Sequence, residues 1–261
     1  MAYFNIADAT FSQSINTQDI VPSGMTWNND GSKMYEIGQN STNIYEYDVS
    51  TPYDIATATF SKSIATQDLF PQGMAWNNDG SKMYEIGLDS AEIYESDVST
   101  PYDIATATVS KSINTQDSTP QGMAWNDDGS KLYEIGVGSD KIYEYDVSTA
   151  YDIGTAVFSQ SVSTQDNGPT GMTWNNDGSK LYEVGVSSAK IYEFDVSTPY
   201  DIATATFSQS INTQDSTPQG MAWNNDGSKM YEIGYGSDLI YEYDVTPTVT
   251  ASPIAHILQM I

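Results

Sequence analysis

The protein has 261 residues, of which 35 are acidic and 9 are basic, giving a formal net charge of −26 at pH 7. Because all nine basic residues are lysines, the chain lacks the basic face and the arginine forks that nucleic-acid recognition requires, and an anionic membrane surface repels it. The absence of cysteine excludes disulfides, zinc–thiolate sites and thiol nucleophiles. No apolar run approaches the roughly 18 residues that cross a bilayer, so we expect no membrane insertion.

In chain order, short strand-like runs follow one another without any helical periodicity. The first is residues 9–15, and the next is residues 24–28, which precede an Asn-Asp-Gly-Ser turn typical of a hairpin. Residues 33–37 form a run that stops at a glycine, and residues 44–49 form the following one. After a Ser-Thr-Pro break, residues 58–64 repeat the sequence pattern of residues 9–15.

This set of four runs recurs with a fixed period along the chain. The five tryptophans mark the period, because each one follows the last by 49 residues: Trp27, Trp76, Trp125, Trp174 and Trp223. Four short antiparallel strands in each unit are typical of a β-propeller blade. The sequence therefore predicts an all-β fold, a five-bladed propeller of four-stranded antiparallel blades over residues 1–245, followed by a non-repeated tail over residues 246–261.

The two ends of the repeat array predict how the ring closes. The chain begins with a fourth-strand sequence that has no preceding three strands, and the array ends with three strands that have no fourth. We expect residues 9–15 to complete the last blade, which removes open sheet edges that would otherwise promote aggregation.

Two segments resemble a known repeat family. Residues 120–133 (PQGMAWNDDGSKLY) and 142–149 (IYEYDVST) resemble the YVTN-type β-propeller repeat, although a glutamate follows Leu-Tyr where that family has valine. The family includes surface-layer modules, lactonase-like enzymes and binding proteins. The near-identical units also resemble repeats of bacterial and phage surface proteins, which implies an extracellular or virion- or cell-surface location. A five-bladed ring resembles the tachylectin-type lectins in architecture.

Differences among the five copies predict where a ligand would bind. Two connections vary, the one before each first strand and the one between the second and third strands, which in one copy contains Tyr235. Both should lie on one face, where binding loops commonly occur, although unconstrained drift explains the same variation. On that face each copy carries a Gln-Asp pair that offers donors and acceptors for sugar hydroxyls: Gln18, Asp19, Gln67, Asp68, Gln116, Asp117, Gln165, Asp166, Gln214 and Asp215. The alternative role of these aspartates is to fix the loop through bonds to the backbone.

The residues that stay constant have mainly structural interpretations. The tryptophans should pack between blades. Glu36, Glu46 and Asp48 should be partly buried, with tyrosine hydroxyls and Lys33 as donors. A bound calcium ion is the alternative for these carboxylates, and no other cofactor is expected.

Catalysis finds little support in the sequence. The only histidine, His256, lies in the tail, and the carboxylates recur in every copy, whereas an active site is usually single. We therefore expect a protein that is not an enzyme but a multivalent binding module for glycans or cell surfaces. A structural or display repeat without a ligand, natural or engineered, and a lactonase-like hydrolase are the alternatives. The apolar end of the tail predicts contact with a partner or another copy.

Overall fold

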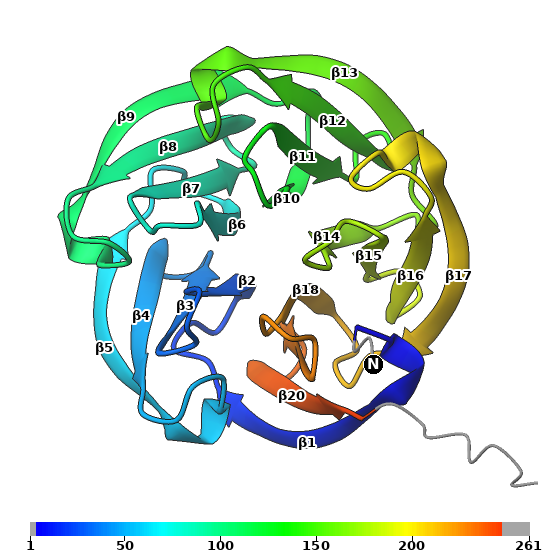
Figure 1. Cartoon of the computed structure of the whole chain (residues 1–261). Helices are drawn as coiled ribbons and strands as arrows, with labels where there is room; N and C mark the ends of the chain where they lie inside the picture. Colours follow the sequence, from blue (N-terminus) through cyan, green and yellow to red (C-terminus); the bar gives the residue numbers. More distant parts are fainter. Residues whose placement is uncertain (1–3, 247–261) are drawn as a thin grey trace, which may run out of the picture.

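The computed structural model describes residues 4–246, which form a five-bladed β-propeller (Figure 1). Each blade is a four-stranded antiparallel sheet whose innermost strand lies nearest the ring axis, as predicted. Blade 1 consists of β2 (Pro22–Trp27), β3 (Lys33–Gly38), β4 (Asn43–Val49) and β5 (Ala58–Ala65). Blade 2 consists of β6 (Pro71–Trp76), β7 (Lys82–Gly87), β8 (Glu92–Val98) and β9 (Ala107–Asn114). Blade 3 consists of β10 (Pro120–Trp125), β11 (Lys131–Gly136), β12 (Lys141–Val147) and β13 (Ala156–Ser163).

The remaining two blades repeat this order of strands. Blade 4 consists of β14 (Pro169–Trp174), β15 (Lys180–Gly185), β16 (Lys190–Val196) and β17 (Ala205–Asn212). Blade 5 consists of β18 (Pro218–Trp223), β19 (Lys229–Gly234), β20 (Leu239–Val245) and, from the other end of the chain, β1 (Ala9–Asn16). One three-residue 3₁₀ helix precedes each outermost strand: η1 (Ile6–Asp8), η2 (Ile55–Thr57), η3 (Ile104–Thr106), η4 (Ile153–Thr155) and η5 (Ile202–Thr204).

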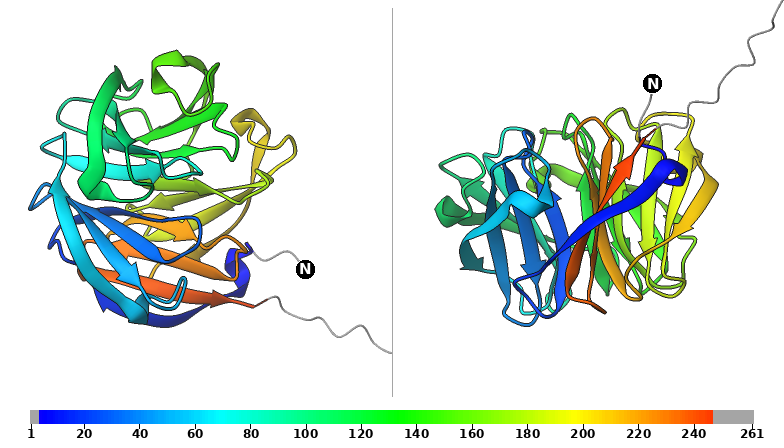
Figure 2. Two further views of the ribbon diagram at one scale, coloured as in Figure 1. Left: turned by 60° about the vertical axis from the view of Figure 1, so that its left-hand side comes forward. Right: turned by 90° about the horizontal axis from the view of Figure 1, so that it is seen from below.

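The ring closes in the way that the sequence predicted. β1 pairs antiparallel with β20, from Ala9 opposite Val245 to Asn16 opposite Leu239. Both views of Figure 2 show the two strands side by side, β1 in blue and β20 in red. Residues 247–261, for which contact with a partner was predicted, lie outside the described residues. Within residues 4–246, no helix has the length and hydropathy needed to span a membrane.

The hydrophobic core lies between neighbouring blades. Trp27, for example, has 7% of its surface exposed, and its ring lies with its centroid 4.9 Å from that of Tyr231 in blade 5. The β2–β3 hairpin ends in a turn where Gly31 has a φ of 72°, a conformation that favours glycine, as the Asp-Gly signal predicted. The prediction that the tryptophans pack between blades is confirmed.

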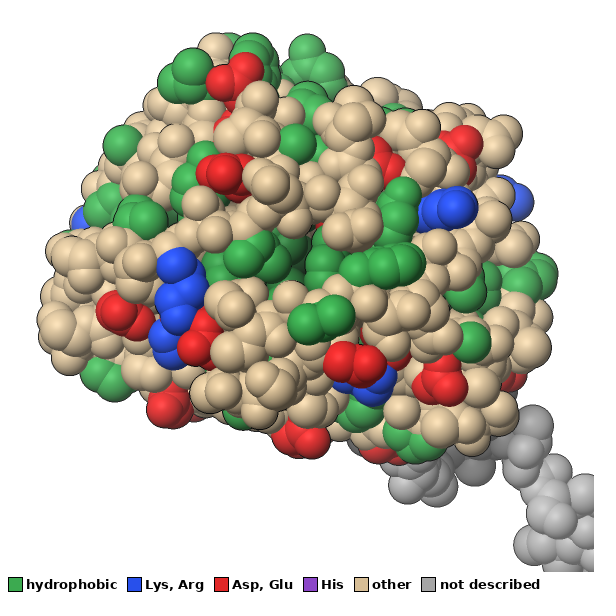
Figure 3. Space-filling model, turned by 90° about the horizontal axis from the view of Figure 1, so that it is seen from above, with side chains coloured by type: hydrophobic (Ala, Val, Ile, Leu, Met, Phe, Trp, Pro, Cys, Tyr) green, Lys and Arg blue, Asp and Glu red, His purple; other side chains and the backbone are tan. Residues whose placement is uncertain are grey.

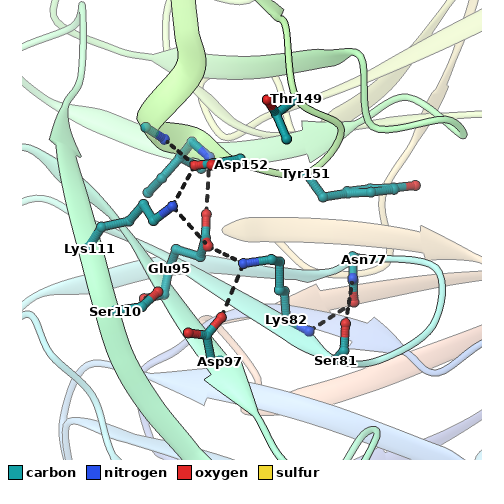
Figure 4. A network of polar contacts seen from close by, with 12 residues as sticks. Asn77, Ser81, Lys82, Glu95, Asp97, Ser110, Lys111, Thr149, Tyr151 and Asp152 are labelled. Carbon is teal, nitrogen blue, oxygen red and sulfur yellow. Dashed lines mark hydrogen bonds and ion pairs between the residues drawn. The ribbon is translucent and has the colours of Figure 1, made fainter.

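A polar latch also joins each blade to the next, and Figure 4 shows the one between blades 2 and 3. Glu95 of β8 is buried and accepts a hydrogen bond from the backbone N–H of Ile153 in η4 (3.0 Å). Lys82 binds Glu95 from within the same blade, and the Nζ of Lys111 lies 2.5 Å from Asp152, whose side chain caps η4. The buried carboxylate thus ties the outer part of one blade to the 3₁₀ helix of its neighbour.

The outer edge of the ring carries both hydrophobic and polar side chains. Figure 3, seen from the edge of the ring, shows hydrophobic side chains among polar ones, with basic side chains next to acidic ones. The hydrophobic residues exposed on the outermost strands include Phe11, Phe60, Val109, Phe158 and Phe207. Single exposed hydrophobic residues of this kind are common on soluble proteins and carry no functional argument.

Candidate functional site at the ring axis

The two faces of the ring carry different connections. The β1–β2 and β3–β4 connections meet on one face, where the N–H of Gln39 donates to the carbonyl of Val21 (2.9 Å). The β2–β3 and β4–β5 connections meet on the other face, where the N–H of Tyr53 donates to the carbonyl of Gly31 (3.1 Å). We call these the variable face and the constant face, because their loops differ or agree among the five repeats. The prediction that the two variable connections share a face is confirmed.

On the variable face, the predicted aspartates hold the loops together. Asp117 is buried, and its carboxylate accepts hydrogen bonds from the backbone N–H groups of Thr119 (2.8 Å), Gly138 (3.0 Å) and Ser139 (3.1 Å). Burial raises the pKa of this carboxyl, but the hydrogen bonds from Ser139 and Thr119 outweigh that effect and lower it. A Cβ at Gly136 would lie 2.3 Å from the Asp117 carboxyl carbon, which explains why every repeat has glycine there.

The glutamine and the aspartate of each predicted Gln-Asp pair therefore do not form a binding site together at the surface. All five aspartates are buried, with 2–3% of their surface exposed, so they do not present their acceptors to a ligand: Asp19, Asp68, Asp117, Asp166 and Asp215. The five glutamines beside them are exposed: Gln18, Gln67, Gln116, Gln165 and Gln214. Tyr235 is also exposed, in the β19–β20 loop. A binding role for the glutamines and for Tyr235 stays a prediction.

A hollow lies at the ring axis, on the constant face. It has a volume of about 580 Å³, and we call it the funnel. Its wall consists of the last residues of the innermost strands and the first residues of the turns that follow them. The residues that line it are mainly methionine, tryptophan and asparagine, with one carboxylate, Asp127, and one tyrosine, Tyr200.

Two kinds of asparagine line the funnel. Asn28 and its counterparts are buried and stabilise the turn: the Asn28 side chain accepts from the N–H of Lys33 (3.0 Å) and donates to Ser32 (3.1 Å). Asn29 and its counterparts are exposed at the rim. The indole N–H groups of the five tryptophans are buried and have no hydrogen-bond partner within residues 4–246. The funnel thus combines apolar rings with exposed amides.

The funnel was not predicted from the sequence, because the candidate binding residues were those in the connections that differ among the repeats. The turn after each innermost strand is nearly identical in all five repeats, so the sequence predicted only a structural role for it. A signal was nevertheless present in the sequence. The rim position is asparagine in four repeats and aspartate only at Asp127, a single asymmetric carboxylate in an otherwise repeated set.

The buried carboxylates of the blades have the donors that the sequence analysis expected. Glu36 accepts from the Tyr47 hydroxyl and from the backbone N–H of Asp19 (2.8 Å). Lys33 binds both Glu46, which is buried, and Asp48, which is exposed. The prediction that Asp48 is partly buried was therefore wrong, because its side chain lies at the solvent-exposed side of the ion pair. Within residues 4–246, no group of three or more histidine, cysteine, aspartate or glutamate side chains is arranged to hold a metal ion. Calcium binding stays an untested alternative.

Comparisons with known proteins place the fold. No protein-family model and no curated protein sequence matches the chain. The solved structure of glutaminyl cyclase from Myxococcus xanthus is similar, with 12% identity and a TM-score of 0.65 over 92% of this chain and 97% of that one. A Bacteroides uniformis protein with the provisional name 6-phosphogluconolactonase has 16% identity and a TM-score of 0.53, over 87% of this chain and 68% of that one.

A protein of unknown function from Desulfotomaculum acetoxidans is similar at 13% identity and a TM-score of 0.54, over 82% of this chain. The chain spans 65% of that protein's length.

These likenesses correct one expectation. The prediction that the protein is not an enzyme was wrong. It was inferred from the recurrence of the carboxylates in every repeat, but structures of this fold carry the names of enzymes, glutaminyl cyclase among them. Repetition of the blade does not exclude catalysis. At 12–16% identity the likeness shows the fold and not an activity or the YVTN family. The chain is a five-bladed β-propeller of four-stranded antiparallel blades.

Proposed function

We propose that the protein binds a compact polar ligand in the funnel. The observation that carries this proposal is the cavity of about 580 Å³ at the ring axis, with exposed amides at its rim. Ligand pockets commonly measure about 300–1,000 Å³ and combine apolar walls with a few convergent polar groups. The accessible surface of the funnel is mainly polar and comes from the rim asparagines, and the largely buried methionine and tryptophan side chains supply a smaller apolar part.

The charge of the funnel narrows the class of ligand. No lysine is among the residues that line it, and its one charged side chain is the Asp127 carboxylate. With a net charge of −26 on the chain, an anion would meet repulsion and find no cationic partner in the funnel. A neutral or cationic ligand fits this environment, whereas a phosphorylated sugar acid does not.

The test compares two exposed side-chain amides on opposite faces. A panel of neutral saccharides, amino-acid amides and small amines is screened by thermal shift, and binding compounds are titrated by calorimetry. We expect Asn29→Ala, at the funnel rim, to weaken binding about tenfold or less, because one hydrogen bond is worth about 0.5–1.5 kcal/mol. Gln18→Ala, on the variable face, should leave binding unchanged. The proposal fails if Gln18→Ala weakens binding and Asn29→Ala does not.

The same compounds are followed for chemical conversion, because structures of this fold include named enzymes. A neutral lactone is included for the lactonase-like alternative. Turnover that Asp127→Asn abolishes would make the funnel an active site. Silence of the whole panel would favour the structural or display alternative, in which the ring has no ligand.

A second candidate function uses the variable face, on the surface of a cell or virion. It is favoured by exposed hydrophobic loop residues that differ from blade to blade: Ile20, Leu69, Phe70, Val137 and Tyr235. Aromatic and aliphatic side chains next to exposed glutamines can contact the apolar faces and the hydroxyls of a glycan. A glycan array would test this, and Gln18→Ala, not Asn29→Ala, should then reduce the signal.

A further inference from the structure

The rim of the funnel carries a belt of hydrogen bonds that runs from blade to blade. The Asn29 side chain donates from its Nδ2 to the main-chain carbonyl of Asn78, and Asn78 donates in the same way to the carbonyl of Asp127 (2.5 Å). Asn176 donates to the carbonyl of Asn225, and Asn225 donates to the carbonyl of Asn29. Four of the five blade junctions are therefore linked in this way.

The belt breaks at the fifth junction, between blades 3 and 4. A carboxylate only accepts hydrogen bonds, so Asp127 cannot donate to the carbonyl of Asn176. The carbonyls of Asn29, Asn78 and Asp127 each accept two bonds, one from a neighbouring amide and one from a tyrosine hydroxyl. Among the described residues, the carbonyl of Asn176 accepts only from the Tyr200 hydroxyl (2.6 Å), which leaves one lone pair free within residues 4–246.

The break coincides with a change in the wall of the funnel. Tyr53, Tyr102, Tyr151 and Tyr200 occupy equivalent positions, but Tyr200 is the only one that lines the funnel. Burial raises the pKa of Tyr200 to about 12, and the negative charge of the nearby Asp127 carboxylate adds to this increase. One Asp127 oxygen accepts weakly from the Asn78 amide (3.2 Å). The junction between blades 3 and 4 therefore contains the Asp127 carboxylate, the Asn176 carbonyl with one free lone pair, and the neutral phenol of Tyr200.

We propose that this junction is the anchor for a protonated amine. The inference rests on the proposed function, because it names the class of ligand that the funnel takes. An ammonium group has three N–H donors, and it can give charge-assisted hydrogen bonds to the Asp127 carboxylate and a further one to the Asn176 carbonyl. The organic part of the ligand then lies against the methionine and tryptophan side chains. Of the five junctions, only this one has a carboxylate among the residues that line the funnel, so the ring binds one amine and not five.

The test uses the full chain and three probes of one shape and different charge: phenethylamine, 2-phenylethanol and 3-phenylpropionate, titrated by calorimetry at pH 7. We expect one phenethylamine per chain, bound at least tenfold more tightly than the alcohol, with the carboxylate weakest. Asp127→Asn should lower the affinity for the amine at least tenfold and abolish the preference for the amine over the alcohol. Asn29→Asp should open a second junction and raise the stoichiometry for the amine to two.

The outcomes separate this inference from the proposed function. If no probe binds wild type and no compound of the wider panel binds, both fail. If the alcohol binds as tightly as the amine, or if Asp127→Asn keeps the preference for the amine, the funnel binds ligands but the amine anchor is wrong. Five equivalent amine sites would also overturn it. Circular dichroism of Asp127→Asn and Asn29→Asp, both at exposed positions, checks that the variants fold.

Discussion

At the scale of single residues, the buried glutamates of the second strands differ in one partner. In blades 1, 3 and 5 a tyrosine hydroxyl donates to the carboxylate, as Tyr47 does to Glu36. In blades 2 and 4 the tyrosine is replaced by Ser96 and Phe194. Burial then raises the pKa of Glu85 and Glu183 to about 7, although backbone N–H groups still donate to both. These two carboxyls take up protons near neutral pH.

We expect the free energy of unfolding to fall as the pH rises from about 4.5 to 7. Because the pKa of Glu85 is about 7 in the folded protein and near 4.5 in the unfolded chain, the folded state binds more protons across this window. The loss should be about 1–3 kcal/mol for each glutamate and level off above pH 7. Denaturant unfolding at several pH values measures it.

Two variants assign this effect to blade 2. Glu85→Gln removes the titrating group and should flatten that blade's share of the pH dependence. Ser96→Tyr restores the phenol donor found in blade 1, opposite the small Val109, and should reduce the pH dependence while keeping the carboxyl. An unchanged pH profile in both variants would contradict the assignment.

At the scale of elements, the five 3₁₀ helices were not predicted from the sequence. They are only three residues long, too short for any periodicity to show. What holds them comes from another blade: the N–H of Ile153 bonds to Glu95 of blade 2. The four strands of each blade were predicted because their alternation and their turn residues are local. The latches depend on contacts between blades, which the order of residues within one repeat does not reveal.

The latch between blades 2 and 3 predicts a graded response at Lys111. Lys111→Met removes the donor to Asp152 and should lower the free energy of unfolding by about 1–2 kcal/mol, because the Asp152 carboxylate loses its cationic partner and, among the described residues, keeps only the backbone N–H of Gly154 as a donor. Lys111→Gln should cost about 0.5 kcal/mol or less, because Gln160 makes the same latch in blade 3, with bonds to Asp201 (2.8 Å) and Glu144 (2.9 Å). Equal losses in both variants would contradict the role of the latch.

At the scale of the whole molecule, the ring was predicted in full and the funnel was not. The period of 49 residues and the unmatched strands at the two ends determine the number of blades and the closure. The funnel depends on how far the five innermost strands stay from the axis and where the Asn29 side chain points. Neither property can be derived from one repeat, and the break at Asp127 gains meaning only once the belt of Asn29 and its counterparts is seen.

Ring closure by β1 predicts the outcome of two rearranged chains. Deletion of residues 1–16 should abolish cooperative thermal unfolding, because it uncovers β20 and removes the latch to blade 4. A circular permutant that starts at Thr17 and continues from Val245 through Ser-Thr-Pro into residues 4–16 should keep the melting temperature within a few degrees. The linker copies the one in blade 1, where Ser50–Pro52 precede Tyr53, the counterpart of Phe4. Loss of cooperative unfolding in the permutant would contradict this account.

The pairing of β1 with β20 also has a consequence for the order of events during folding. Thr10 bonds to Asp244, 234 residues further along the chain. The outermost strand of the last blade, β1, is therefore synthesised before every other strand but can pair only after β20 has been synthesised. Contacts so distant in sequence form slowly. Until then β1 can pair with the third strand of any other blade, because β4, β8, β12 and β16 are nearly identical to β20. Such pairing gives an incorrect blade within the chain or a bridge to another chain. Because the repeats are nearly identical, we expect refolding to be slow and to depend on the protein concentration.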